Sequence, residues 1–402
     1  MAFVNTIVSW LTIQHVLDKP SGFPWELILL HGLDFVQNFG LRILLFAVLL
    51  KVLLSPLDVY SRYKMRKNAR ITLALKDRLA DLKRQYADDR MEYQRREMAM
   101  KRQEGFSLFG SCLPIIVSLI LSIWIWGSVR GMSEYGNMRQ YLELYDVYQR
   151  EMAIAPEDSK YDANSPTERA QQAVFEYFQN NRQLDSFLWI KNIWSSDTPW
   201  TSAIPDNLNS AGKFARDNLI TVQELDKDGN VTKSYKLDDS EFNDLLARYD
   251  VVTKMIRNDP SNNTNGLLIL ILFSSGAMFL SQLLVQRAQK AGQSMSVNTD
   301  SPFANALQNN MKVMIYIMPA IMAFFMLLQP AAFTLYIGIG SVTTTIISLT
   351  STQIMKSFEK HHERELVTKV QKYGRPDPKE LFNIQDIEFD KQDSSTSQDK
   401  KE

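Results

Sequence analysis

The chain has 402 residues, and its 45 Lys and Arg balance 45 Asp and Glu. Zero net charge and a slightly negative mean hydropathy suit a soluble protein, but both average over apolar and charged blocks that alternate along the chain. A single cysteine excludes a disulfide framework and a cysteine-rich metal site, and four scattered histidines do not indicate a metal centre.

The N-terminal region, 1–38, holds one basic residue, Lys19, and has no small-residue cleavage site, so we expect no signal peptide. Within 25–38, apolar residues recur at positions 25, 28, 29, 33 and 36. This spacing predicts an amphipathic helix in the membrane interface. The alternative is a plain extension of the first membrane span.

Five segments are long and apolar enough to cross a bilayer as helices. They are 39–57, 108–129 and, within 266–351, the segments 266–285, 312–329 and 331–351. Only the Gln329–Pro330 turn separates the last two, which predicts a tight antiparallel hairpin. The fold class is therefore an all-α membrane protein with five transmembrane helices.

The distribution of charge predicts the orientation of these spans. The stretch 61–104 has a net charge of +7, whereas 130–265 has a net charge of −7. Because short basic stretches beside a span stay in the cytoplasm, we expect 61–104 inside and 130–265 outside. The N-terminus is then external, and the tail 352–402 is cytoplasmic, with a disordered end rich in Asp, Ser, Gln and Lys.

The segment 58–107 is predicted to form a cytoplasmic helical hairpin. Apolar residues from Ile71 to Tyr86 recur at steps of three and four, and Ala87-Asp88-Asp89 is a predicted turn. The excess of positive charge is suited to anionic lipid, a ribosome or a nascent chain, although a solvated hairpin without a partner is the alternative. The candidate recruitment residues are Arg66, Lys67, Arg70, Lys83 and Arg84.

The external region 130–265 is long enough to fold in part, with mixed α and β structure. We predict helices over 134–152 and 166–184. A β-hairpin is predicted from 219–225 and 231–236, which flank the turn sequence DKDGN. The same run resembles a calcium loop, but its twelfth position is Leu237 rather than Glu, which favours a simple turn.

No enzyme motif is present: the chain has no GxSxG, no Walker A loop, no HExxH and no paired cysteines. We therefore expect neither an enzyme nor a cofactor. Polar residues inside the spans remain to be explained, and Lys51 is the foremost of them. Its amine either snorkels to the cytoplasmic headgroups or lines a water-filled cavity. Arg42, half a turn out of phase with Lys51, is predicted to anchor the outer interface.

The other spans carry hydroxyls and amides, among them Ser118, Ser122, Gln282 and Thr344. A hydroxyl in a helix often bonds a carbonyl of its own helix, so each residue alone indicates little. Their presence on several spans together suggests a shared polar interior.

Three groups of residues resemble the YidC/Oxa/Alb family of membrane protein insertases. Asn38-Phe39-Gly40, Lys51 and Ser55-Pro56-Leu57 match the first core span in order and spacing, and Gly110-Ser-Cys112-Leu-Pro114 resembles the second. Phe187-Leu-Trp189-Ile, followed by Asp197-Thr-Pro199, is similar to the family's external motif. The chain differs from the family in having Lys51 rather than Arg, Ser118 rather than Gln, and a longer external region.

The resemblance implies five spans around a hydrophilic groove that is open to cytoplasm and lipid. Lys51 would supply the charge of the groove, and Ser118, Ser122, Gln282 and Thr344 its polar lining. The implied function is insertion of hydrophobic segments of nascent proteins into the membrane, without covalent chemistry. The alternative function is a polytopic transporter or channel with a polar path at the midplane.

The same resemblance implies nascent membrane proteins, the Sec translocon and membrane lipids as partners, together with a ribosome or the signal recognition particle receptor, and no DNA. We expect a multi-pass protein of a bacterial plasma membrane. The short region ahead of the first span favours the Gram-positive type.

Overall fold

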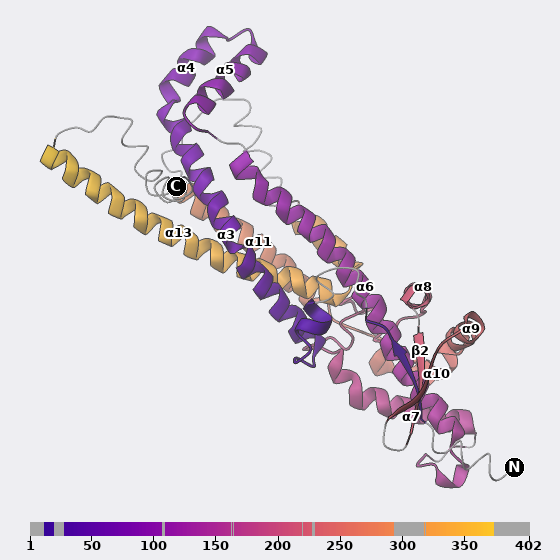
Figure 1. Cartoon of the computed structure of the whole chain (residues 1–402). Coiled ribbons are helices and arrows are strands. Elements are labelled where there is room, and N and C mark those ends of the chain that lie inside the picture. The colour runs from indigo at the N-terminus through magenta and orange to yellow at the C-terminus, as the bar shows by residue number, and fades with distance from the viewer. Residues whose placement is uncertain are drawn as a thin grey trace, which may run out of the picture. The chain divides into compact units, whose positions relative to one another are not determined.

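The computed structural model describes residues 12–19, 28–106, 109–161, 163, 165–218, 220–226, 230–292, 317 and 319–373. These residues are mostly helical. The chain forms two compact units, Met1–Ser348 and Leu349–Glu402, and the packing below is that of the first (Figure 1).

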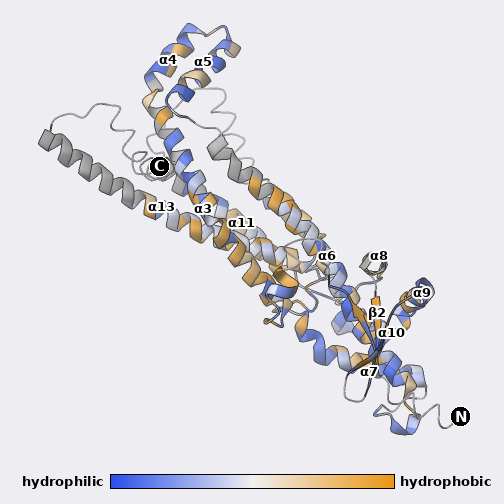
Figure 2. Ribbon diagram, in the orientation of Figure 1, coloured by the Kyte–Doolittle hydropathy of each residue, from blue (hydrophilic) through white to orange (hydrophobic). Residues whose placement is uncertain are grey.

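Four long helices dominate the structure: α3 (Phe39–Ala74), α6 (Phe109–Ala153), α11 (Ile269–Gly292) and α13 (Ala331–Tyr373). In the described part of the chain, Phe39–Lys64 and Ala331–Met355 are long and apolar enough to span a membrane, and Ile269–Leu284 is a shorter apolar helix. Apolar residues gather along α6, α11 and α13 in Figure 2. The predicted fourth span, 312–329, lies partly outside the described residues; 319–327 are helical, and the predicted turn separates them from α13.

Two predicted span ends lie inside longer helices. α3 continues past Leu57 although it contains Pro56, whose ring removes one backbone hydrogen bond without ending the helix. α6 likewise continues from the second predicted span through the external helix predicted over 134–152. A rigid helix therefore links each of these spans to the region beyond it.

The predicted helical hairpin is confirmed. α4 (Lys76–Gln85) and α5 (Arg90–Gln103) follow α3 and are joined by the turn at 86–89. The Asp89 side chain caps α5 by accepting a 3.0 Å hydrogen bond from the backbone N–H of Glu92. Ile71, Leu75 and Leu79 form a small separate core, as their spacing predicted.

The external region contains the helices α7 (Pro166–Asn181), α8 (Asn209–Asn218), α9 (Asp239–Ala247) and α10 (Tyr249–Asn258). The predicted hairpin is confirmed as β2 (Ile220–Leu225) paired with β3 (Val231–Lys236). A third strand, β1 (Thr12–Leu17), was not predicted; it pairs antiparallel with β2, so the sheet order is β1-β2-β3. His15 fixes β1 to α6, since its backbone N–H and ring both bond the carboxylate of Asp146.

The helix predicted over 25–38 is much shorter in the structure. The described part forms one π-helical turn, η1 (Ile28–Gly32), whose Leu29 and Leu30 are buried. Arg42 binds the loop that follows this turn: its guanidinium donates to the backbone carbonyls of Leu29, Asp34 and Val36 and pairs with the Asp34 carboxylate at 3.1 Å. The prediction that Arg42 anchors a lipid interface is wrong, because its side chain is buried beneath this loop.

Candidate functional site

Lys51 lies on the inner side of α3. The residues around it on the outer side, such as Leu49 and Leu53, are exposed, whereas Ala47 and Leu50 are buried. Lys51 itself is half-buried, and its Cε lies only 3.2 Å from the point where a Cβ on Gly340 would stand. The lysine stem therefore packs on the backbone of α13, where a larger residue would crowd it.

Gly340 begins a stripe of small and polar residues on α13. Thr344 and Ser348 follow at steps of four, which places all three on one face of the helix. Thr344 is half-buried and Ser348 is fully buried; the hydroxyl of Ser348 has no hydrogen-bond partner among the described residues. The structure thus brings the predicted residues Lys51 and Thr344 to the same pair of facing helices.

The remaining predicted groove residues lie on other helices. Ser122 is exposed on α6, Gln282 is half-buried on α11, and the side chain of Ser118 lies outside the described part of the structure. Among the described residues of these spans, four hydroxyls bond carbonyls of their own helix at 2.7–2.9 Å, as their chemistry allows: they belong to Ser275, Ser341, Thr343 and Thr345.

Asp58 is a charged neighbour of Lys51 that the sequence reasoning missed. It lies seven residues, or two helical turns, beyond Lys51 on α3 and is half-buried. Its carboxylate attracts both Lys51 and Arg62. The seven-residue spacing could have indicated that Asp58 lies on the same face of a helix as Lys51. That inference requires a helix that continues past Pro56, which the sequence analysis did not expect.

Two of the predicted recruitment residues, Lys83 and Arg84, lie on α4 of the hairpin, and the other three, Arg66, Lys67 and Arg70, lie on α3. Lys83 is exposed, the Arg84 side chain is 85% exposed, and Lys67 is half-buried. The side chains of Arg66 and Arg70 lie outside the described residues. Arg84 and Asp81 form an exposed pair at 4.0 Å, an arrangement that adds little stability.

The motif predicted from 187–199 forms a compact structure that contacts the starts of α3, α11 and α13 and the middle of α6. We call residues 183–199 the external clasp. It bonds α3 through Asn38, whose amide donates at 2.7 Å to the carbonyls of both Gln183 and Ser186. Gly40 is required beside this bond, because a Cβ there would lie 2.4 Å from the Phe187 ring.

The clasp bonds α6 through its buried Trp194. The Ser133 hydroxyl donates to the Trp194 carbonyl at 2.6 Å, and the indole N–H donates at 2.6 Å to the carboxylate of Asp185. Arg139 donates to both oxygens of the same carboxylate, at 2.8 and 2.7 Å. Burial opposes the Arg139 charge, yet the carboxylates of Asp185 and Glu143 hold its pKa above the ordinary value.

The clasp also caps the starts of α11 and α13. The fully buried Asp197 accepts bonds from the backbone N–H groups of Leu267 and Leu270 at 3.0 and 2.8 Å. At α13, the N–H groups of Ala331 and Ala332 donate to clasp carbonyls at 2.8 and 2.9 Å. Helix starts leave such N–H groups without partners, so the clasp satisfies them while it holds the helix ends together.

These features define a helical membrane protein: long apolar helices, a cation between two of them, and a polar clasp that bonds the helices to one another. The chain belongs to the 60Kd inner membrane protein family, whose family model matches residues 31–360. This membership confirms the resemblance to the YidC/Oxa/Alb family.

Curated relatives share shorter stretches with the chain. It is 34% identical over 123 residues to the membrane protein insertase YidC of Laribacter hongkongensis, which covers 31% of this chain and 21% of the relative. The insertase of the same name from Xanthomonas oryzae is 37% identical over 102 residues, and these cover 25% and 16%. That of Methylobacillus flagellatus is 35% identical over 112 residues, covering 28% and 20%. The matched stretches therefore span about a fifth of these relatives or less.

Proposed function

We propose that the chain is a membrane protein insertase and chaperone that passes hydrophobic segments of nascent proteins into the bilayer through a positively charged groove. The position of Lys51 carries this proposal: it lies on the inner side of α3, against the small-residue stripe of α13. A cation that only snorkelled along lipid would not need a facing glycine. Family membership favours an insertase over the alternative of a transporter or channel.

The proposed mechanism is electrostatic attraction followed by partition. Lys51 attracts the acidic polar end of a client across the water-filled groove, where two charges roughly 4 Å apart attract by about 1 kcal/mol. Ser118, Ser122, Gln282 and Thr344 offer hydrogen bonds along the path. Moving the client's apolar part into lipid then supplies the driving force, about 25 cal/mol per Å². No bond is made or broken, so neither a catalytic residue nor a cofactor is required.

We propose five spans, at 39–57, 108–129 and three within 266–351, with the N-terminus outside and the tail 352–402 in the cytoplasm. Pairing of β1 with β2 supports this topology, because residues 12–17 and 220–225 must then lie on the same side of the membrane. The external clasp supports a groove that is closed on the outside, since it binds the starts of α3, α11 and α13 to the middle of α6. The segment 58–107 then projects into the cytoplasm.

The partners we propose are nascent membrane proteins, delivered at a bacterial plasma membrane. Lys83 and Arg84 are exposed on the hairpin, and Lys67 is half-buried on α3. We expect them to form a basic surface together with the predicted Arg66 and Arg70. Such a surface suits anionic lipid, a ribosome, the signal recognition particle receptor or the Sec translocon.

An insertion assay in proteoliposomes tests the role of Lys51. The client is a single-span protein with an acidic translocated tail, and the variants are Lys51→Ala, Lys51→Glu and Lys51→Arg. Loss of an attraction of about 1 kcal/mol lowers the rate about fivefold in Lys51→Ala, and Lys51→Glu is slower still, whereas Lys51→Arg keeps its rate. Leu53→Ala, on the exposed side of α3, is the matched control and remains active. A normal rate for Lys51→Ala would refute the groove charge.

Photocrosslinking maps the path directly. A crosslinker at position 118 or 344 should react with a stalled client, and one at position 53 should not. Adducts at 53 in place of 344 would contradict the proposed path.

The recruitment role of the hairpin is tested by charge reversal. Lys83→Glu combined with Arg84→Glu should lower client insertion without unfolding the helices. Arg95→Glu is the matched control, because Arg95 is as exposed as Arg84 (84% against 85%) and also forms a 4.0 Å pair with a neighbouring acid. Equal loss in both variants would show that the effect is not specific to α4.

A further inference from the structure

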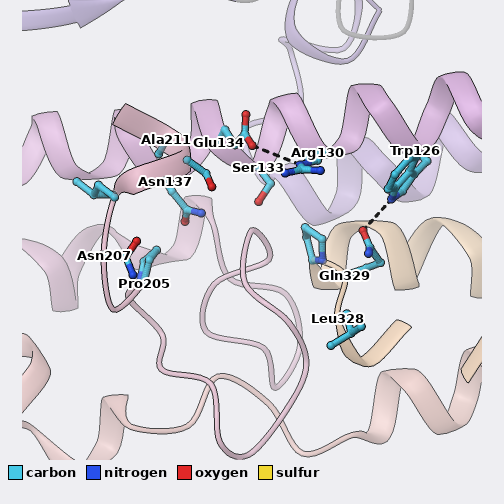
Figure 3. A pocket seen from close by; sticks show the side chains of 13 residues that line it. Trp126, Arg130, Ser133, Glu134, Asn137, Pro205, Asn207, Ala211, Leu328 and Gln329 are labelled. Carbon is cyan, nitrogen blue, oxygen red and sulfur yellow. Dashed lines mark hydrogen bonds and ion pairs between the residues drawn. The ribbon is translucent and has the colours of Figure 1, made fainter. Parts of the chain in front are cut away.

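A cavity of about 390 Å³ lies beside the external clasp and has no part in the proposed groove. Its walls come from α6, from residues 205–211, which include the start of α8, and from the turn 328–330 (Figure 3). This volume is in the range of small-molecule binding sites.

The cavity lies at the level where apolar spans meet water. On α6, Trp126 closes the apolar run and Arg130 is the first charged residue after it. On the opposite wall, the turn 328–330 ends the helical residues 319–327, and Leu328 is 71% exposed. Trp126 bridges the two walls by donating a 2.9 Å hydrogen bond to the Gln329 side chain. Tryptophan is enriched at this level of membrane proteins.

One wall of the cavity carries both signs of charge. The Arg130 side chain is 63% exposed, and its Nε lies 3.5 Å from an oxygen of the Glu134 carboxylate. A guanidinium has four further N–H donors, which suit a phosphate. Burial raises the pKa of Glu134, while Arg130 and Lys213 oppose that shift. An added ammonium group would stabilise the carboxylate further.

We propose that this cavity binds the headgroup of a phospholipid that carries a primary amine, of the phosphatidylethanolamine kind. The phosphate binds Arg130, the ammonium binds Glu134, and the acyl chains leave past Trp126 and Leu328. An anion alone fits less well, because Glu134 would repel it. A trimethylated amine fits less well too, because it offers no N–H to that carboxylate.

Lipid binding to the purified full-length protein tests the proposal. Native mass spectrometry measures retention from an equimolar mixture of phosphatidylethanolamine, phosphatidylglycerol and phosphatidylcholine. Phosphatidylethanolamine should be retained most strongly. Arg130→Ala should bind it about tenfold more weakly, the effect of losing a hydrogen bond to a charged group. Glu134→Gln should bind phosphatidylethanolamine and phosphatidylglycerol alike.

Two controls establish that the effect belongs to this site. Lys160→Ala removes an exposed external ion pair, with Glu176, and should change nothing. Lys51→Ala should also keep its lipid, so failure of the insertase proposal would leave this one standing. Equal retention of all three lipids by the unmodified protein, or unchanged retention by Arg130→Ala, overturns the site.

Competition distinguishes a membrane lipid from other occupants. Soluble glycerophosphoethanolamine at the same concentration should not displace the lipid, because it lacks the chains that contact Trp126 and Leu328. Full displacement by it would overturn the lipid assignment in favour of a soluble phosphoester. Displacement by a peptide copied from an acidic client tail would overturn it in favour of the client.

Discussion

The external clasp makes a sharp prediction at Gly136, on the face of α6 that contacts Trp194. A Cβ added at this position would lie 2.4 Å from the indole Nε1 and 2.5 and 2.6 Å from two ring carbons. Trp194 is 2% exposed, so its ring has no free space to enter. Gly136→Ala must therefore displace the ring or push α6 away from the clasp.

The expected cost has two parts. Forcing an extra carbon into a packed site costs about 1–3 kcal/mol. Displacing the indole also breaks its bond to the Asp185 carboxylate, and a hydrogen bond to a charged group contributes about 1.5–3 kcal/mol. Replacing a helical glycine by alanine stabilises the helix by about 1 kcal/mol, which offsets part of this cost. Gly136→Ala should therefore lower the free energy of unfolding by about 2–5 kcal/mol.

Unfolding in mixed micelles, followed by far-ultraviolet circular dichroism, measures this change. Gly127→Ala is the matched control: it lies on the same helix, and nothing stands within 4 Å of the added Cβ. The control should be neutral or more stable by up to about 1 kcal/mol. If the two variants unfolded alike, the close contact between Gly136 and Trp194 would not contribute to stability, and our account of the clasp would be wrong.

Three further predictions concern single carboxylates. Asp197→Ala should lower the free energy of unfolding by about 1–3 kcal/mol, because Asp197 is buried. This loss should exceed that of Asp238→Ala at the exposed cap of α9. Calorimetry that ranked the two variants in the reverse order would contradict this prediction. Burial raises the pKa of Glu143 above 4.5, so the folded protein binds this proton more tightly than the unfolded chain. The stability of the unmodified protein, compared with that of Glu143→Gln, should therefore fall as pH rises from 4.5 through the raised pKa. Thermal midpoints of the two proteins measure this, and a difference between them that did not change with pH would argue against the prediction. Asp58→Asn should raise the insertion rate of acidic clients about twofold to fivefold, because the Asp58 carboxylate competes with the client for Lys51. If Asp58→Asn raised the rate equally in a Lys51→Ala background, this competition would not be the cause.

Local patterns in the sequence predicted much of the fold. The helical hairpin of α4 and α5, the turn before α13 and the strands β2 and β3 were all found because the residues that specify them are neighbours in the chain. Apolar spacing predicts a helix face, and Asp, Asn and Gly predict a turn, without reference to distant residues.

Contacts between distant segments were not predictable in the same way. The partner of β1 lies some 200 residues further along the chain, and the short run TIQHVL has no turn to announce a hairpin. Where the predicted interfacial helix ends early, the loop is held by Arg42, which lies beyond it in sequence and bonds the carbonyls of Leu29 and Asp34. The continuity of α3 through Pro56 likewise depended on its surroundings.

In the candidate site too, single residues were predictable from the sequence, whereas their distant partners were not. Lys51 was identified from its charge within an apolar run, but Gly340, which faces it, was not. The motif of the external clasp was recognised as a sequence resemblance, yet its contacts with four helices became visible only from the bonds of Asn38, Asp185 and Asp197. Motifs indicate which residues matter, whereas their partners require coordinates.

The pairing of β1 with β2 constrains how the protein itself is made. Leu17 pairs with Ile220, so the first strand emerges from the ribosome long before its partner exists. Under the proposed topology, β1 must reach the far side of the membrane and wait there while two spans and most of the external region are synthesised. A newly made chain therefore passes through a stage with an exposed strand edge, and this stage is where its own biogenesis is most vulnerable to mispairing.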